Sequence, residues 1–238
     1  MKSVLTAATL AILASTAAQS ADMAARPLTK APVVDRLYSW TGLYVGGTAG
    51  YGWGRTRQID DTRSSPEFDY EGFVGGGTLG YNWQAGAVVL GFETDISYAD
   101  IKGAIADGPG WGCGFPTTSC HNEVQWFGTA RGRLGYALDR FLPYITGGLA
   151  YGRVYGDFTS CSLQCIESTR TGWTAGAGLE WAFASSWSAK VEYLRVDLGE
   201  FSVTSGGNTL GVVTTFDVVR AGINYKFDWG GAPLVAKY

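Results

Sequence analysis

Long segments in which apolar side chains alternate with small or polar ones run through this chain from residue 40 onward. A period of two is typical of a β-strand, because successive side chains of a strand point to opposite faces. After residue 20 no unbroken apolar run reaches the ~18–20 residues that a membrane-spanning helix needs. The alternation predicts eight strands, at residues 41–55, 72–83, 87–100, 123–138, 142–158, 171–184, 187–203 and 216–227.

The charged residues of these strands lie on the face opposite the aromatic residues. In segment 87–100, for example, Leu90 and Phe92 alternate with Glu93 and Asp95. A soluble barrel points its apolar face inward, whereas a membrane barrel points it at lipid and keeps polar side chains in the lumen. We therefore predict a lumen-facing charge network of Glu93, Asp95, Arg131, Arg133, Glu180, Lys190, Glu192, Arg220 and Lys226.

Aromatic residues gather near both ends of the expected strands, which decides between the two kinds of barrel. Bilayer interfaces favour such rings of Trp, Tyr and Phe, because these side chains tolerate the headgroup zone. The fold class we expect is all-β, an eight-stranded antiparallel up-and-down transmembrane β-barrel. One ring would hold Trp53, Phe73, Tyr98, Trp126, Tyr151 and Trp173, and the other Trp83, Tyr136, Trp181, Phe183, Trp187, Tyr225 and Phe227.

The connections between strands alternate in length. Residues 84–86, 139–140 and 185–186 are tight turns, whereas 56–71, 101–122, 159–170 and 204–213 are long and polar. Outer-membrane barrels have short turns on the periplasmic side and long loops outside the cell. The four long loops are therefore the expected sites of host or envelope contacts. Outer-membrane lipid and lipopolysaccharide are the other expected partners, and a monomer is the expected state.

The ends of the chain predict export. Lys2, the apolar residues 4–18 and the small residues Ala18 and Ser20 form the pattern of a signal peptide, residues 1–20. A retained membrane anchor is the alternative, and the segment is short for one. Residues 21–39, rich in Pro and charge, predict a flexible periplasmic lead-in before the barrel at 40–228, and 229–238 a short tail. The net charge of −3 gives no basic face for nucleic acid.

Four cysteines fall in two of the polar stretches, Cys113 with Cys120 and Cys161 with Cys165. Four cysteines allow three pairings, and local pairs are the simplest. A zinc site that includes His121 is the alternative. Because export leads to an oxidising compartment and the spacing is no metal signature, we expect disulfides and no metal.

Three further patterns suggest chemistry and have simpler explanations. Residues 75–80 match G-x-G-x-x-G, but strand alternation continues through them, so no cofactor site is expected. The carboxylate pairs Glu93–Asp95 and Glu180–Glu192 share a face with arginines and lysines, which predicts ion pairing. His121, the only histidine, lies in an expected loop. We therefore expect no enzyme and no catalytic residue.

Two details of the pattern remain to be explained. Alternation slips at Leu194–Arg195 and near Arg153–Val154, which suggests bulges or exits from the bilayer. Glycines are frequent on the lumen-facing side, where they leave room for large neighbours or allow strands to bend. They are Gly46, Gly50, Gly76, Gly80, Gly148, Gly176 and Gly178.

Several motifs recur in order along the chain: WTGLYVGG at 40–47, GYGWG at 50–54, GGGTLGYNW at 75–83, LGYA at 134–137 with PY at 143–144, and AGINYKF at 221–227. Together they resemble the porin-like, immunogenic outer-membrane proteins of alphaproteobacteria known from Brucella and Rhizobium. The tail, with Trp229 and VAKY at 235–238, is also similar. The four loop cysteines depart from the family's pattern.

The resemblance implies an eight-stranded barrel in the outer membrane of a Gram-negative bacterium, with a role in envelope integrity and surface antigenicity and without catalytic residues. A narrow porin-like channel for small solutes is the alternative function. A lipid or peptide hydrolase and a soluble ligand-binding barrel are more distant rivals.

Overall fold

The computed structural model describes residues 38–60, 63–64, 66–106, 119–157, 165–205 and 208–227. These residues belong to one compact unit, residues 37–238. The predicted signal peptide, most of the predicted lead-in, the tail, Cys113 and Cys161 lie outside the described residues. The described part contains no helix long and apolar enough to cross a membrane.

Strand is the dominant structure of the described residues. The strands are β1 (Gly42–Asp60), β2 (Arg63–Ser64), β3 (Phe68–Ala85), β4 (Val88–Ala106), β5 (Ser119–Tyr136), β6 (Phe141–Asp157), β7 (Cys165–Ala182), β8 (Trp187–Ser205) and β9 (Asn208–Lys226). The two-residue β2 pairs with the end of β1 and is part of the hairpin that leads to β3.

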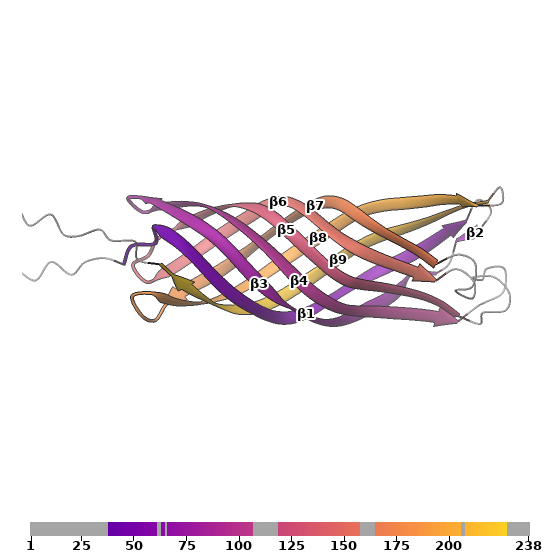
Figure 1. Ribbon diagram of the computed structural model, residues 1–238, viewed down its shortest axis with the longest axis horizontal. Helices are drawn as coiled ribbons and strands as arrows, with labels where there is room; N and C mark the ends of the chain where they lie inside the picture. The colour runs from indigo at the N-terminus through magenta and orange to yellow at the C-terminus, as the bar shows by residue number, and fades with distance from the viewer. Residues whose placement is uncertain are drawn as a thin grey trace, which may run out of the picture. The chain divides into compact units, whose positions relative to one another are not determined.

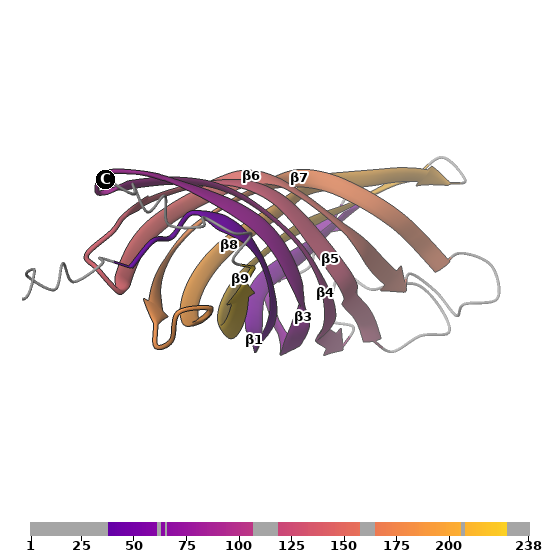
Figure 2. The same ribbon diagram turned by 60° about the vertical axis from the view of Figure 1, so that its left-hand side comes forward.

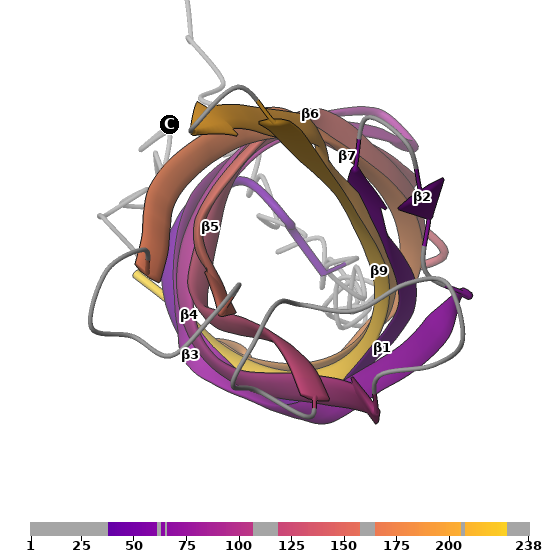
Figure 3. The ribbon, with the colours of Figure 1, turned by 90° about the vertical axis from the view of Figure 1, so that its right-hand side faces the viewer.

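The eight long strands form a closed barrel. Each pairs antiparallel with the next in sequence, and β1 also pairs with β9, which closes the sheet (Figures 1 and 3). Closure satisfies the backbone hydrogen bonds of every strand at bilayer depth, which lipid cannot do. The predicted eight-stranded, antiparallel up-and-down barrel is confirmed.

The register fixes the tilt of the strands. A path from Trp53 through one directly paired residue on each strand ends at Leu43, ten residues away on β1. Ten residues at ~3.3 Å against eight strands at ~4.8 Å correspond to a tilt of about 41°. Figure 2 shows this oblique course from a second side. The tilt assigns each residue a height along the barrel axis.

The strands extend further than the sequence indicated. The loop ranges 56–71, 101–122, 159–170 and 204–213 were too wide, because the paired backbone includes residues 57–60, 101–106, 119–122, 165–170 and 208–213. His121, which was predicted to lie in a loop, is therefore an exposed residue of β5. Side-chain alternation weakens outside the bilayer, but backbone pairing continues there. Each loop begins where backbone pairing stops, and the side chains in the sequence do not mark that position.

In the described ladders, register shifts occur at Tyr98/Ile101, Val124/Trp126 and Asp197/Glu200. The second shift lies opposite Arg153 and Val154, where a bulge was suggested. All three lie toward the outer ends of their strands, and bulges are frequent at barrel rims. At Leu194–Arg195, however, the ladder is regular. The change of pattern there comes from the apolar side chains that fill the outer part of the lumen.

Candidate functional site

The lumen at bilayer depth contains a buried ionic network. Eight of the nine predicted network residues point inward, and each is at most 4% exposed. Four are cations and four are anions, so their formal charges cancel. The eight are Glu93, Asp95, Glu180, Glu192, Arg131, Arg133, Lys190 and Arg220.

Glu93 lies at the centre of this network. One of its carboxylate oxygens accepts a hydrogen bond from Arg131 Nη2 at 2.5 Å. The other accepts from Lys190 Nζ at 2.8 Å and from the hydroxyl of Tyr44 at 2.8 Å. These donors come from β5, β8 and β1, so the carboxylate joins strands on different sides of the barrel.

Two arginines extend the network toward the outer end. Arg131 contacts Asp95 at 3.0 Å and Glu192 at 2.9 Å. Arg220 contacts the same two carboxylates at 2.9 and 2.8 Å. Thr129 donates to Asp95 at 2.6 Å. Because each carboxylate is shared by two guanidiniums, removal of one residue leaves several partners unsatisfied.

A second group lies on the periplasmic side of the first. Arg133 donates to Glu180, which also accepts hydrogen bonds from Ser188 at 2.5 Å and Asn224 at 2.8 Å. The guanidinium of Arg133 lies 3.6 Å from the centre of the Tyr144 ring. The predicted network contained charged residues alone and left out its uncharged members. Strand alternation also places these on the inward face, namely Tyr44, Thr129, Tyr144, Ser188 and Asn224.

Lys226, the ninth predicted member, is outside this network. Its ammonium lies 4.4 Å from the centre of the Tyr38 ring and donates to the carbonyl of Ser39. Here the chain ahead of β1 covers the periplasmic mouth. Trp40 is 2% exposed, and its indole donates to the carbonyl of Asp139 at 3.0 Å. Tyr38 and Ser39, assigned to the flexible lead-in, thus contact the barrel.

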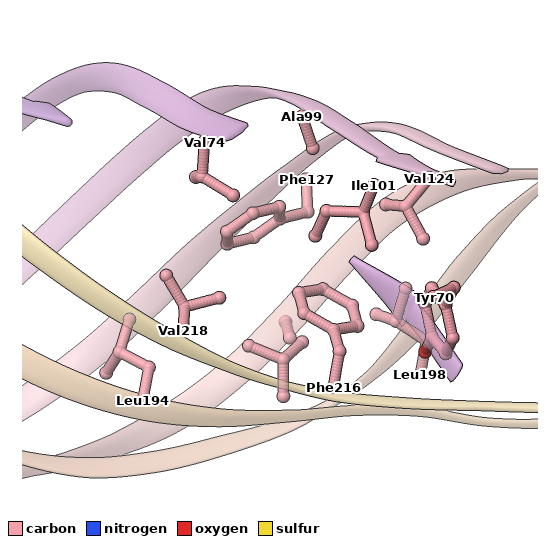
Figure 4. Close-up of a cluster of buried hydrophobic side chains, with 12 residues drawn as sticks. Tyr70, Val74, Ala99, Ile101, Val124, Phe127, Leu194, Leu198, Phe216 and Val218 are labelled. Atoms are coloured by element: carbon pink, nitrogen blue, oxygen red, sulfur yellow. The ribbon is translucent and has the colours of Figure 1, made fainter. Parts of the chain in front are cut away.

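The outer part of the lumen is apolar, which the sequence analysis did not predict. Its side chains point toward one another across the barrel (Figure 4), and Phe127 and Phe216 meet edge to face with ring centres 5.2 Å apart. The prediction of a polar lumen therefore holds only at bilayer depth. The apolar cluster consists of Tyr70, Val74, Ala99, Ile101, Val124, Phe127, Ala150, Leu194, Val196, Leu198, Phe216 and Val218.

The change from a polar lumen at bilayer depth to an apolar outer lumen follows from what surrounds the barrel at each height. Within the bilayer the outer face must be apolar, so the polar groups are inside. Near the outer end the outward side chains become charged, as at Arg55 and Arg195, and the inward ones become apolar, as in a soluble barrel. In β8, Glu192, Leu194 and Val196 all point inward and are buried. The apparent slip at Leu194–Arg195 is therefore an exchange of chemistry between two faces at constant alternation.

Several inward glycines lie beneath large side chains. A Cβ on Gly80 would lie 2.4 Å from the ring of Tyr44, and one on Gly178 2.5 Å from the ring of Tyr144. Each tyrosine is the direct cross-strand partner of its glycine. The rings thus lie over the bare backbone and place their hydroxyl groups in the ionic network. At these positions the glycines leave room for large neighbours, which is one of the two explanations that the sequence suggested for them.

Gly80→Ala should therefore destabilise the barrel, because the new methyl group displaces Tyr44 from Glu93. Overpacking of this kind costs about 1–3 kcal/mol. Gly77→Ala is a matched control on the same strand, since its Cβ would lie 3.8 Å from the nearest atom. Urea-induced unfolding in detergent micelles, followed by tryptophan fluorescence, measures both. Equal stability of the two variants would show that the contact is unimportant.

The outward face is apolar over a band that matches a bilayer. Leu90 is 46% exposed and Ile223 52% exposed, whereas Arg131 is fully buried. From Leu43 to Trp53 the outward residues of β1 span ten residues, about 25 Å along the axis at the derived tilt. By the same geometry, the six predicted outer-ring residues lie within about 5 Å of one level, and the other ring lies about 25 Å below.

Among the described residues, the other candidates from the sequence do not form a chemical site. The carboxylates of both suggested acidic pairs are held in ion pairs or hydrogen bonds of the network. Within the part of the chain that the structure describes, no group of His, Cys, Asp and Glu could hold a metal ion. Cys120 and Cys165 lie at the ends of β5 and β7, and their side chains are outside the description. The disulfides remain a prediction.

A closed barrel with an ionic lumen, an apolar outer band and two aromatic rings defines a transmembrane barrel of the outer membrane. Residues 6–227 match the outer membrane protein beta-barrel domain family. The 31 kDa outer-membrane immunogenic protein of Brucella melitensis is 40% identical over 95% of this chain and 100% of its own length. The 22 kDa outer membrane protein of Rhizobium leguminosarum is 32% identical over 79% of each chain.

The chain therefore belongs to the outer-membrane β-barrel family that includes the immunogenic proteins of Brucella, and its location is the outer membrane. Among solved structures, the outer membrane protein OprG of Pseudomonas aeruginosa is similar in fold, with a TM-score of 0.52 and 12% identity over 79% of this chain and 96% of its own. The relatives named here are described as outer-membrane proteins and not as enzymes.

Proposed function

We propose that this protein is a structural barrel of the outer membrane that maintains envelope integrity and presents its outer end as a surface antigen. The observation that carries the proposal is the filling of the lumen at two depths. Arg131, Lys190 and Arg220 are at most 2% exposed at bilayer depth, and Phe127 and Phe216 are fully buried near the outer ring. Solvent therefore does not reach these side chains.

This arrangement supports a structural role over the alternative, a narrow porin-like channel for small solutes. An eight-stranded barrel has an interior that side chains can fill, and a conducting path would have to displace both layers. The antigenic part of the proposal is supported by the names of the Brucella relatives, which describe them as immunogenic.

Deletion of the gene from its own host tests the structural role. We expect faster entry of an apolar fluorescent dye and greater detergent sensitivity, both restored by a plasmid copy, with unchanged uptake of small sugars. An intact permeability barrier together with slower sugar uptake would contradict the proposal and favour the channel. Antibodies against the folded protein should bind intact cells, and failure to bind them would remove the antigenic part.

A further inference from the structure

The ladder between β7 and β8 stops at the membrane surface. Its outermost pair is Trp173↔Asp197, and Trp173 belongs to the outer aromatic ring. Beyond that point β7 still pairs with β6 as far as Cys165, and β8 still pairs with β9 as far as Ser205. Figure 2 shows β7 and the gold outer end of β8 diverging. Among the described residues, the two strands therefore have no ladder with each other outside the bilayer.

β8 turns away from β7 at a bulge. Its register with β9 shifts between Asp197 and Glu200. Gly199 has a φ of 78°, a conformation that favours glycine, and its N–H donates to Asp197 Oδ1 at 2.8 Å. Leu198 beside it is 2% exposed and belongs to the apolar cluster. A bulge and an N–H that is already bonded make the edge of β8 a poor template for another strand.

The edge of β7 is regular over the same stretch. Its register with β6 is continuous from Trp181 to Cys165, and residues 165–172 contain no proline. The N–H of Ala182 donates to the carbonyl of Arg140, on the β6 side. Because backbone groups alternate in direction along a strand, even-numbered residues of β7 face β6 and odd-numbered ones face away from it. The backbone groups that point to the side that β8 has left belong to residues 165, 167, 169 and 171.

A regular strand edge without a ladder is a template for an added strand. Another barrel in the same membrane does not fit it. Two such copies are related by an axis along the membrane normal, which would cross their β7 strands at about 80°, twice the tilt. Paired strands lie within about 35° of each other. The edge therefore suits an extended segment that approaches from outside the cell.

The surroundings of the edge determine which side chains such a segment needs. Thr169 and Thr171 point outward and are exposed, so outward side chains of an added strand would meet water. On the inward side, Leu198 reaches behind β7 toward β6, where a Cβ on Gly152 would lie 3.3 Å from its Cδ1. The lumen behind the edge is thus apolar. A segment with small or apolar residues inward and polar residues outward fits both faces.

We propose that the free edge of β7, residues 165–171, binds an extended polypeptide segment from outside the cell as an added antiparallel strand. The four outward-directed sets of backbone groups hold the segment, and the two faces select its side chains. Seven residues at ~3.3 Å give a contact about 23 Å long. Antiparallel addition is expected because it is the more stable pairing per residue. The proposal depends on the pairing at the outer end and not on the filled lumen.

The probe is a synthetic peptide with the sequence of residues 149–157, LAYGRVYGD, which in the barrel pairs antiparallel with β7 across its other edge. Fluorescence anisotropy of the labelled peptide measures its binding to the full chain folded in lipid nanodiscs. Two further versions carry N-methyl groups on alternate backbone nitrogens. Each methyl group removes one N–H donor and leaves the side chains unchanged. The methylated positions are 151, 153 and 155 in one version and 152, 154 and 156 in the other.

The two versions distinguish the two edges of β7. On the free edge, odd-numbered peptide residues lie opposite odd-numbered residues of β7 and point their N–H groups at them. Methylation at the odd positions should therefore weaken binding about tenfold or more, and methylation at the even positions should have little effect. The opposite pattern would show that the peptide replaces β6, which would overturn the proposal. Equal binding of both versions, or no binding of the unmethylated peptide, would overturn it as well.

A variant of the barrel tests the same edge from the other side. Thr169→Pro removes one N–H from the middle of the free edge and leaves the β6 ladder intact, because residue 169 faces away from β6. It should weaken peptide binding about tenfold or more, whereas Thr169→Val keeps the N–H and should bind like the wild type. Unboiled gel mobility shows that each variant is folded. Wild-type affinity of folded Thr169→Pro would contradict the proposal, and if that variant does not fold, the methylated peptides decide on the wild-type barrel.

Discussion

Replacement of Glu93 by glutamine is expected to lower the free energy of unfolding by about 3–5 kcal/mol, because it breaks a buried ion pair and leaves the partner charges in place. Glu93 receives hydrogen bonds from Arg131, Lys190 and Tyr44, and the network is neutral only while Glu93 is charged. Urea-induced unfolding in lipid vesicles, followed by tryptophan fluorescence, measures the change.

Two further variants separate charge balance from general damage. Glu123→Gln removes a half-buried carboxylate that contacts Lys102 at 3.7 Å near the outer surface, where ion pairs contribute only about 0–1 kcal/mol. Addition of Lys190→Met to Glu93→Gln restores neutrality and should recover part of the lost stability. If Glu93→Gln were as stable as Glu123→Gln, the ionic network would not be what stabilises the barrel at bilayer depth.

The second large effect is expected at Phe127. Phe127→Ala should lower the free energy of unfolding by about 3–5 kcal/mol, because it removes a fully buried ring from contact with Phe216 and leaves a cavity. The same unfolding experiment measures it. Because the ionic network below is intact, the variant should still not conduct ions.

Phe92→Ala provides the matched comparison. Phe92 points outward in the membrane-facing band and is 56% exposed. Lipid chains can fill the space that its ring leaves, so the cavity part of the loss is absent and the destabilisation should be smaller. An equal or larger loss for Phe92→Ala would mean that the apolar cluster is loosely packed and does not close the outer lumen.

Much of the barrel could be predicted because alternation reports the face of each residue directly. Glu93 and Arg131 share a face with other charged residues and oppose Leu90 and Leu134, so their inward position follows from counting by two. The aromatic residues then decide which face meets lipid. Neither step needs the register of the strands.

Other features could not be predicted, because they depend on register or on surroundings that change along a strand. The contact of Tyr44 with Gly80 exists only in the observed pairing of β1 with β3. Leu194 and Phe216 lie on the face that was expected to be polar. Alternation still points them inward, and they are apolar because the barrel leaves the bilayer near them. Trp40 precedes the first strand, and nothing in its local sequence indicates that it covers the periplasmic mouth.

Planar-bilayer recording of the wild-type protein tests most directly whether the lumen is filled from the periplasmic side to the outer ring. With Arg131 and Phe127 both fully buried at their separate depths, purified barrels in the bilayer should give no steady single-channel openings at low voltage. Insertion is checked in the same sample by protection of the barrel from added protease. Steady, uniform openings from inserted wild-type barrels would contradict the account.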